Sequence, residues 1–165
     1  MKPGFGVWVA RCLRLVGARG LAARLLSGAV ARLNARAERW LAQGRFAEAA
    51  ACYELVRELA GPDPVVLGNL AACYRECGRY AQALSCCRLG LSLAPDDPVL
   101  HNNMALCLEE SGHFELALEH YARAMAAGGA NPVFAMNHAA CLARMSAGRS
   151  GGPPETGARE VPLAM

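Results

Sequence analysis

Cysteine and histidine are the residues of this chain best suited to chemistry, and the sequence contains eight of the former and four of the latter. Such side chains can form disulfides, coordinate zinc or act as nucleophiles. Three of the cysteines, however, stand 34 residues apart: Cys73, Cys107 and Cys141. A constant step of this kind places them at one equivalent position in successive structural repeats, where a small, soft side chain fills the core. We therefore interpret them as reduced core thiols of an intracellular protein.

The remaining candidates for metal binding or catalysis lack the necessary spacing. No two pairs of cysteines lie at the separation of zinc ligands, and the adjacent Cys86 and Cys87 have poor geometry for a disulfide. The four histidines do not share a helical face, and Glu109 and Glu110 are most simply explained as a solvated helix surface. No serine–histidine–aspartate set or glycine-rich phosphate loop occurs. The sequence therefore predicts a protein that is not an enzyme, with no catalytic residue, no metal and no cofactor.

One set of polar residues keeps the 34-residue step: Asn69, Asn103 and Asn137. A carboxamide offers two donors and one acceptor, so it can pair with the N–H and the C=O of a peptide backbone together. A row of such groups could hold an extended peptide largely without regard to its side chains. Two simpler explanations remain open, because asparagine also suits a solvated helix face and can bridge to a neighbouring helix.

The residues that must position these side chains repeat with the same step and define two helices in each period. Asp63-Pro64 and Asp97-Pro98 supply an N-cap followed by proline at the first helical position, where its missing N–H is not needed. Gly78 and Gly112 then supply the residue at which a helix often ends. An aromatic residue and an alanine follow with the same period: Phe46, Tyr80 and Phe114, then Ala49, Ala83 and Ala117. A fixed period of this length predicts an all-α solenoid of stacked helical hairpins.

The second period resembles the tetratricopeptide repeat in the identity and order of its residues. The matching positions are Leu70, Ala71, Tyr74, Gly78, Tyr80, Ala83 and Pro95. The third period fits well except for the final proline, and the first is looser at its start. The resemblance covers roughly residues 30–145 and implies about three repeats plus a lone final helix. We expect repeats at 30–63, 64–97 and 98–131, with a partial repeat at 132–145.

The resemblance implies a right-handed superhelix whose concave face is lined by the first helix of each pair. Some proteins of this family carry an asparagine row on that face, which implies a peptide-binding role for the row here. The candidate binding residues are Asn69, Asn102, Asn103, Asn137, Val99, Leu106 and Met136. One branch of the family clamps acidic chaperone tails with lysine and arginine. The corresponding positions in this chain hold Asn34, Glu38, Val99 and Asn103, so we expect a neutral or basic peptide instead.

The two ends of the chain depart from the repeat. Residues 1–37 carry seven basic residues and no acid, whereas residues 38–145 hold twelve acids against eight arginines, which argues against a nucleic-acid surface on the repeats. Residues 1–29 form a basic segment that could be a capping helix, a mitochondrial targeting sequence or a helix on an anionic membrane surface. Residues 146–165 are rich in glycine and proline, and we expect them to be disordered.

These patterns predict a scaffold or adaptor whose partner is a protein or a peptide. Two alternatives remain open: the chain is a fragment or splice form of a larger repeat protein that serves an enzyme or assembly, or it is a mitochondrial assembly factor. A cytoplasmic location is favoured over a mitochondrial one, and membrane-surface contact is less favoured still. The lone helix at 133–145 retains apolar residues that no next layer would cover, so self-association through it is a further expectation.

Overall fold

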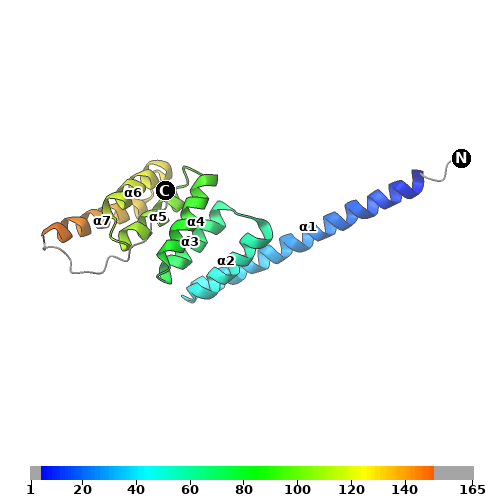
Figure 1. Cartoon of the computed structure of the whole chain (residues 1–165), viewed down its shortest axis with the longest axis horizontal. Helices are drawn as coiled ribbons and strands as arrows, with labels where there is room; N and C mark the ends of the chain where they lie inside the picture. The colour runs from blue at the N-terminus through cyan, green and yellow to red at the C-terminus, as the bar shows by residue number, and fades with distance from the viewer. Residues whose placement is uncertain (1–4, 151–165) are drawn as a thin grey trace.

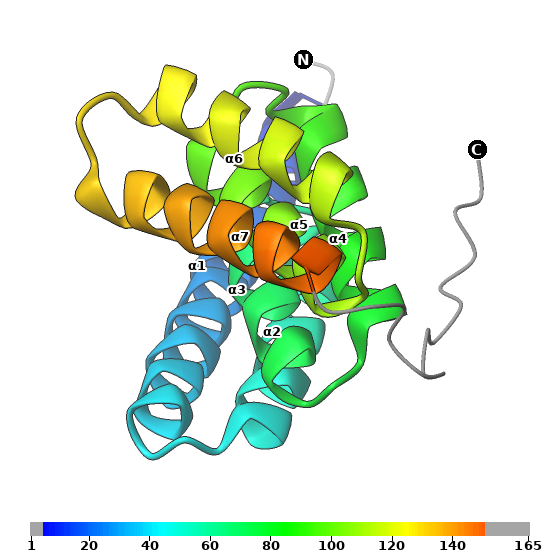
Figure 2. The ribbon, with the colours of Figure 1, turned by 90° about the vertical axis from the view of Figure 1, so that its left-hand side faces the viewer.

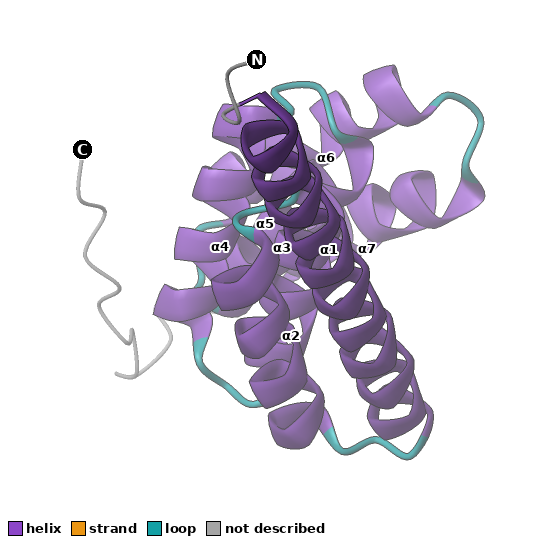
Figure 3. Cartoon of the chain, turned by 90° about the vertical axis from the view of Figure 1, so that its right-hand side faces the viewer, coloured by secondary structure: helices purple, strands orange, loops and turns teal. Residues whose placement is uncertain are grey.

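The computed structural model describes the backbone of residues 5–150 and the side-chain surroundings of residues 23–148. This described part consists of α-helices joined by short turns and contains no strand (Figure 3). The helices are α1 (Phe5–Ala42), α2 (Phe46–Ala60), α3 (Pro64–Glu76), α4 (Tyr80–Leu93), α5 (Pro98–Glu110), α6 (Phe114–Gly128) and α7 (Pro132–Ser150). The predicted all-α solenoid is confirmed, because three helical hairpins are followed by a single final helix.

The first helix of a pair begins and ends where the sequence predicts. The Asp63 carboxylate accepts hydrogen bonds from the backbone N–H groups of Val65 (2.9 Å) and Val66 (3.2 Å), and Asp97 caps α5 in the same way. These bonds satisfy N–H groups that have no partner within the helix. After α3, Gly78 adopts a φ of 70°, which glycine tolerates without strain. The chain can therefore reverse at once into α4.

The hairpins stack in chain order into a curved array (Figure 1). Close backbone contacts join α3 to α5 and α5 to α7, whereas none joins α2 to α4 or α4 to α6 within the described residues. Because the first helices from α3 onward approach one another and the second helices do not, the array curves toward the first helices. We call α1, α3, α5 and α7 the inner helices, and α2, α4 and α6 the outer helices.

Small residues allow the inner and outer helices to cross closely. Ala49, Ala83 and Ala117 are fully buried at one equivalent position of the three outer helices. Where α4 meets α5, a Cβ atom at Gly90 would lie 2.7 Å from Leu100 Cδ1, which is closer than carbon atoms can approach. The recurrence of small residues in the sequence therefore reflects helix packing at near-crystalline density.

Helix α1 is longer than a repeat requires. It runs without a break for 38 residues, so the predicted boundary between a segment at 1–29 and a repeat beginning at 30 falls inside one helix. Its C-terminal part joins the core through Val30, Leu33 and Ala37, while its N-terminal part extends away from the stack (Figure 1). None of the described helices is both long enough and apolar enough to cross a lipid bilayer.

Helix α7 extends to Ser150, five residues beyond the predicted end of the repeats at 145. Residues 146–150 are therefore helical and do not belong to the tail that we expected from residue 146 onward. A single interior glycine, Gly148, weakens a helix by only about 1 kcal/mol and does not end it. The rest of the predicted tail, residues 151–165, lies outside the described residues.

Candidate functional site

The inner helices carry a row of exposed apolar side chains. Val65, Val99 and Val133 occupy the second position of α3, α5 and α7 and are 68%, 52% and 52% exposed. Met136 lies about one turn further along α7 and is 69% exposed, whereas Leu106 of α5 is half-buried. Of the predicted apolar contact residues, Val99 and Met136 are thus exposed to solvent.

The asparagine row lies on the same helices, and two of its members bond to the preceding inner helix. Asn103 Nδ2 donates to the Gly68 carbonyl oxygen at 3.0 Å, which links α5 to α3. Asn137 Nδ2 donates to Asn102 Oδ1 at 2.9 Å, which links α7 to α5. Both bonds join residues 35 positions apart, one more than the repeat step. Bridging to a neighbouring helix, which the sequence left open, therefore occurs at both residues: Asn103 and Asn137 each use one N–H of the side-chain amide for it.

The equivalent bond between α1 and α3 is not formed. In the same register Asn69 would reach Asn34, but the Asn69 side chain lies near the Tyr53 hydroxyl instead. The Asn34 Oδ1 atom is buried and has no hydrogen-bond partner within residues 23–148. Close backbone contacts between α1 and α3 are also absent from the described part of the chain. The junction of α1 with α3 is therefore more open than the two junctions that follow it.

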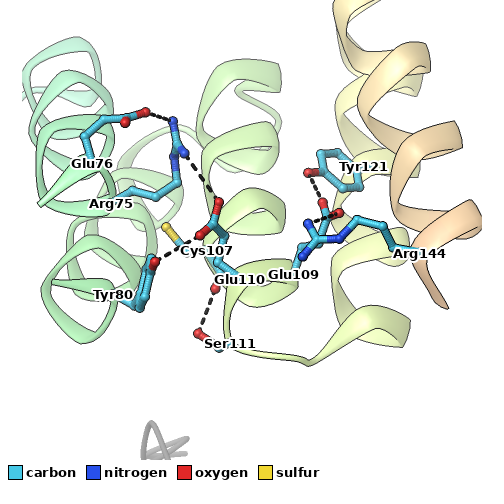
Figure 4. A network of polar contacts seen from close by, with 9 residues as sticks. All are labelled: Arg75, Glu76, Tyr80, Cys107, Glu109, Glu110, Ser111, Tyr121 and Arg144. Atoms are coloured by element: carbon cyan, nitrogen blue, oxygen red, sulfur yellow. Dashed lines mark hydrogen bonds and ion pairs between the residues drawn. The ribbon is translucent and has the colours of Figure 1, made fainter. Parts of the chain in front are cut away.

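A second row of contacts joins the inner helices, again between residues 35 positions apart (Figure 4). Arg75 Nη1 of α3 lies 3.8 Å from Glu110 Oε1 of α5. Glu109 Oε1 of α5 lies 2.8 Å from Arg144 Nη1 of α7. In the first pair the arginine lies on the earlier helix, α3, and in the second pair it lies on the later helix, α7. Two lines of polar contacts, one of amides and one of charges, thus fasten the inner face.

Glu109 is buried, and the expectation of a solvated surface was wrong for this residue. Its carboxylate accepts a hydrogen bond from the Tyr121 hydroxyl at 2.8 Å and another from Arg144 at 2.8 Å. A carboxylate tolerates burial when its charge is paired and its oxygens are hydrogen-bonded. Burial and the hydrogen bond to Glu109 raise the pKa of Tyr121, so its hydroxyl remains a donor. Glu110 is exposed as expected, and it accepts from the Tyr80 hydroxyl at 2.9 Å.

Two histidines form a pair between α5 and α6 that the sequence did not predict. His101 Nδ1 lies 3.0 Å from His120 Nδ1, and His101 Nε2 lies 2.9 Å from the Pro95 carbonyl oxygen. Because a carbonyl can only accept, His101 Nε2 carries the proton and His101 Nδ1 accepts from His120. Burial, together with the nearby His101 and Arg123, lowers the pKa of His120 to about 4. His120 is therefore neutral near physiological pH.

The cysteines with the 34-residue step are core residues, as predicted. Cys73, Cys107 and Cys141 are all fully buried. Burial raises the pKa of the Cys73 and Cys107 thiols to about 12 and that of Cys141 to about 11. Such thiols are protonated near neutral pH and are poor nucleophiles. Among the described residues no group of three or more cysteine, histidine or acidic side chains is placed to hold a metal ion.

Comparison with known proteins identifies the repeats. The family model of the tetratricopeptide repeat matches residues 63–128, which comprise α3 to α6. A comparison with curated proteins finds no match in sequence.

Solved structures with the same fold include the tetratricopeptide domain of Sgt2 from Aspergillus fumigatus, with a TM-score of 0.69, 18% identity and coverage of 82% of this chain and 90% of that chain. The first such domain of Spaghetti (RPAP3), bound to the HSP90 peptide SRMEEVD, has a TM-score of 0.67 and 20% identity, and covers 73% of this chain and 95% of that one. PcrH in complex with the chaperone binding region of PopB has a TM-score of 0.60 and 23% identity, and the match covers 69% of this chain and 92% of that one.

At these identities the solved structures establish the fold, while the family match rests on the sequence of α3 to α6 itself. The two findings agree with the capped inner helices and the buried alanines of the outer helices. The chain therefore contains tetratricopeptide repeats, which the family match places in α3 to α6.

Proposed function

We propose that this chain is a non-catalytic adaptor that captures an extended peptide or a partner helix on its concave face. The observation that carries the proposal is the exposed apolar row of Val65, Val99, Val133 and Met136 on the inner helices. Apolar side chains repeated along one face of a solenoid lose unfavourable contact with water when a ligand covers them.

The asparagine row supports this proposal less strongly than it would if all of its hydrogen-bonding groups were available to a ligand. The bonds to Gly68 and Asn102 each use one donor of Asn103 and Asn137, and they hold the inner helices in register. An amide has a second donor and an acceptor, so a bonded asparagine retains groups for a ligand backbone. Asn69, at the open α1–α3 junction, is half-buried. We assign the hydrogen-bonding role to these remaining groups and the apolar contact to the valines.

Charge on the inner helices favours a neutral or basic ligand. Glu38, Glu76 and Glu110 are exposed on α1, α3 and α5. Arg75 lies between the last two and is engaged by both of them. An acidic peptide would therefore meet carboxylates on all three helices and would find no unengaged base on α3 or α5. The HSP90 peptide SRMEEVD, which is bound in the Spaghetti structure, is a suitable acidic probe to test this preference.

A peptide selection followed by matched substitutions tests the proposal. The full chain is used to select ligands from a random peptide library, and their affinities are measured by fluorescence anisotropy beside that of SRMEEVD. Val99→Gln on α5 is compared with Leu93→Gln on α4, because the two side chains are 52% and 48% exposed. We expect Val99→Gln to weaken binding about tenfold, in line with the roughly 1.5 kcal/mol gained by burying a valine, while Leu93→Gln leaves it unchanged. Equal effects of the two substitutions, or preferential binding of SRMEEVD, would contradict the proposal.

A further inference from the structure

The last inner helix exposes a face that the other inner helices bury. On α3 the residues of this face are Leu67, Ala71 and Tyr74, and on α5 they are His101, Ala105 and Leu108; all six are buried. The residues in the same phase of α7 are Ala135, Ala139 and Leu142, and all three are exposed. The difference arises because α4 covers α3 and α6 covers α5, whereas no described helix follows α7 (Figure 2).

The exposed face continues onto the neighbouring outer helix. Leu84 of α4 is 1% exposed, but Leu118, its equivalent on α6, is only half-buried. We define the end face as Leu118, Ala135, Ala139 and Leu142. It is distinct from the concave face, because Val133 and Met136 lie on another side of α7. The end face has the composition of an inner–outer helix contact, with alanine at the position that is fully buried on α3 and α5.

The charge pattern of α7 restricts what can cover this face. No charged residue occurs between Pro132 and Ala143, and the first one, Arg144, is paired with Glu109. A contact between two copies related by a two-fold axis places each residue near its own equivalent, so a charged face would repel itself. The uncharged segment of α7 avoids this repulsion. Its alanines at positions 135 and 139 also allow two helices to approach closely.

We propose that the end face binds a second copy of this chain, with the two α7 helices packed across a two-fold axis near Ala139. In this arrangement α7 of each copy occupies the place that an outer helix takes on α3 and α5. The contact buries Leu142 and Ala135 of both copies. It leaves the concave faces of both copies open, so self-association and peptide binding are independent of one another.

The oligomeric state of the full chain tests this proposal, with substitutions matched for exposure. Sedimentation equilibrium is measured on the wild type, on Leu142→Glu in the end face and on Leu93→Glu on α4, where the two leucines are 47% and 48% exposed. We expect the wild type and Leu93→Glu to form dimers at tens of micromolar. Leu142→Glu should raise the dimer Kd at least tenfold, because it places two carboxylates near the axis. Far-UV circular dichroism confirms that both variants remain helical.

Two results would overturn the proposal: the wild type remains monomeric at 100 μM, or Leu142→Glu dimerises as strongly as the wild type. If the wild type is monomeric but a chain ending at residue 150 dimerises through Leu142, residues 151–165 would be the occupant of the end face. A selected peptide that binds all variants equally would show that the concave face is intact in each of them.

Discussion

The inner helices α3 and α5 occupy equivalent positions in the stack but are held in place by different kinds of contact. The buried residues of α3 include Leu67, Leu70 and Tyr74 and no charged group. On α5, by contrast, His101, Asn102, Asn103 and Glu109 are all buried, and they are the buried polar residues found within positions 23–148. Apolar packing fixes α3, whereas directional polar bonds add to the packing of α5.

The buried polar residues of α5 bond to three of the helices around it. Asn103 bonds to α3, Asn102 and Glu109 bond to α7, and His101 and Glu109 bond to α6. Hydrogen bonds and paired charges are directional, so they define a single register between neighbours in a way that apolar contacts do not. We infer that α5 sets the curvature of the inner face. Perturbing equivalent positions of α3 and α5 should therefore have unequal effects.

The largest difference is expected at the position shared by Arg75 and Glu109. Glu109→Ala should lower the free energy of unfolding by about 2–4 kcal/mol, because the buried Tyr121 hydroxyl loses its acceptor and Arg144 loses its partner. Arg75→Ala should cost at most about 1 kcal/mol, because its partners Glu76 and Glu110 are exposed. Urea unfolding followed by circular dichroism measures both. If the two substitutions lowered the free energy of unfolding equally, polar contacts would not hold α5 more strongly than α3.

Acid sensitivity is the next largest effect, and it maps to the contact between α5 and α6, where His120 of α6 lies against His101 of α5. The pKa of His120 is about 4 in the folded chain, against about 6.5 in an unfolded one. Between these values the unfolded chain binds a proton that the folded chain does not, so stability is fully present above pH 6.5 and is lost as the pH falls toward 4. Since His120 is partly exposed, we expect a loss on the order of 2 kcal/mol. His120→Gln should flatten the stability profile between pH 7 and pH 5, and an unchanged slope would contradict this assignment.

The asparagines provide the smallest of the three contrasts. Asn103→Ala should cost about 1–1.5 kcal/mol, because it removes a buried hydrogen bond to the Gly68 carbonyl oxygen. Asn69→Ala, at the more open junction with α1, should cost less than 1 kcal/mol. Thermal unfolding of the two variants measures the difference. A larger loss for Asn69→Ala would mean that the α1–α3 junction is as tightly fastened as the α3–α5 junction.

The repeat pattern predicted most of the fold. The 34-residue step placed Asp63 and Asp97 at helix starts, Gly78 at a turn and the alanines at helix crossings, because caps, turns and close contacts each require particular residue types. The unbroken course of α1 through residue 30 was not predicted, because Ser27 and Gly28 are residue types that often mark a helix end. The helical course of residues 146–150 was missed because their composition resembles that of a loop.

The polar contacts were only partly predictable. A 34-residue step showed that the asparagines share a face, but it could not distinguish a bond to a ligand from a bond to the preceding helix. The signal for bridging is the 35-residue step from Arg75 to Glu110 and from Glu109 to Arg144, where opposite charges occur at adjacent positions of successive repeats. The pair of His101 and His120 had no such signal, because it depends on how α6 returns along α5.

The central claim, that the concave face binds peptide, is tested most directly by mapping a selected peptide onto the full chain with ¹⁵N–¹H chemical shifts. We predict that the largest changes fall on the backbone amides of 65–69, 99–106 and 133–137 on α3, α5 and α7. Changes concentrated on α2, α4 and α6, or on the projecting part of α1, would place the binding site elsewhere and contradict the account.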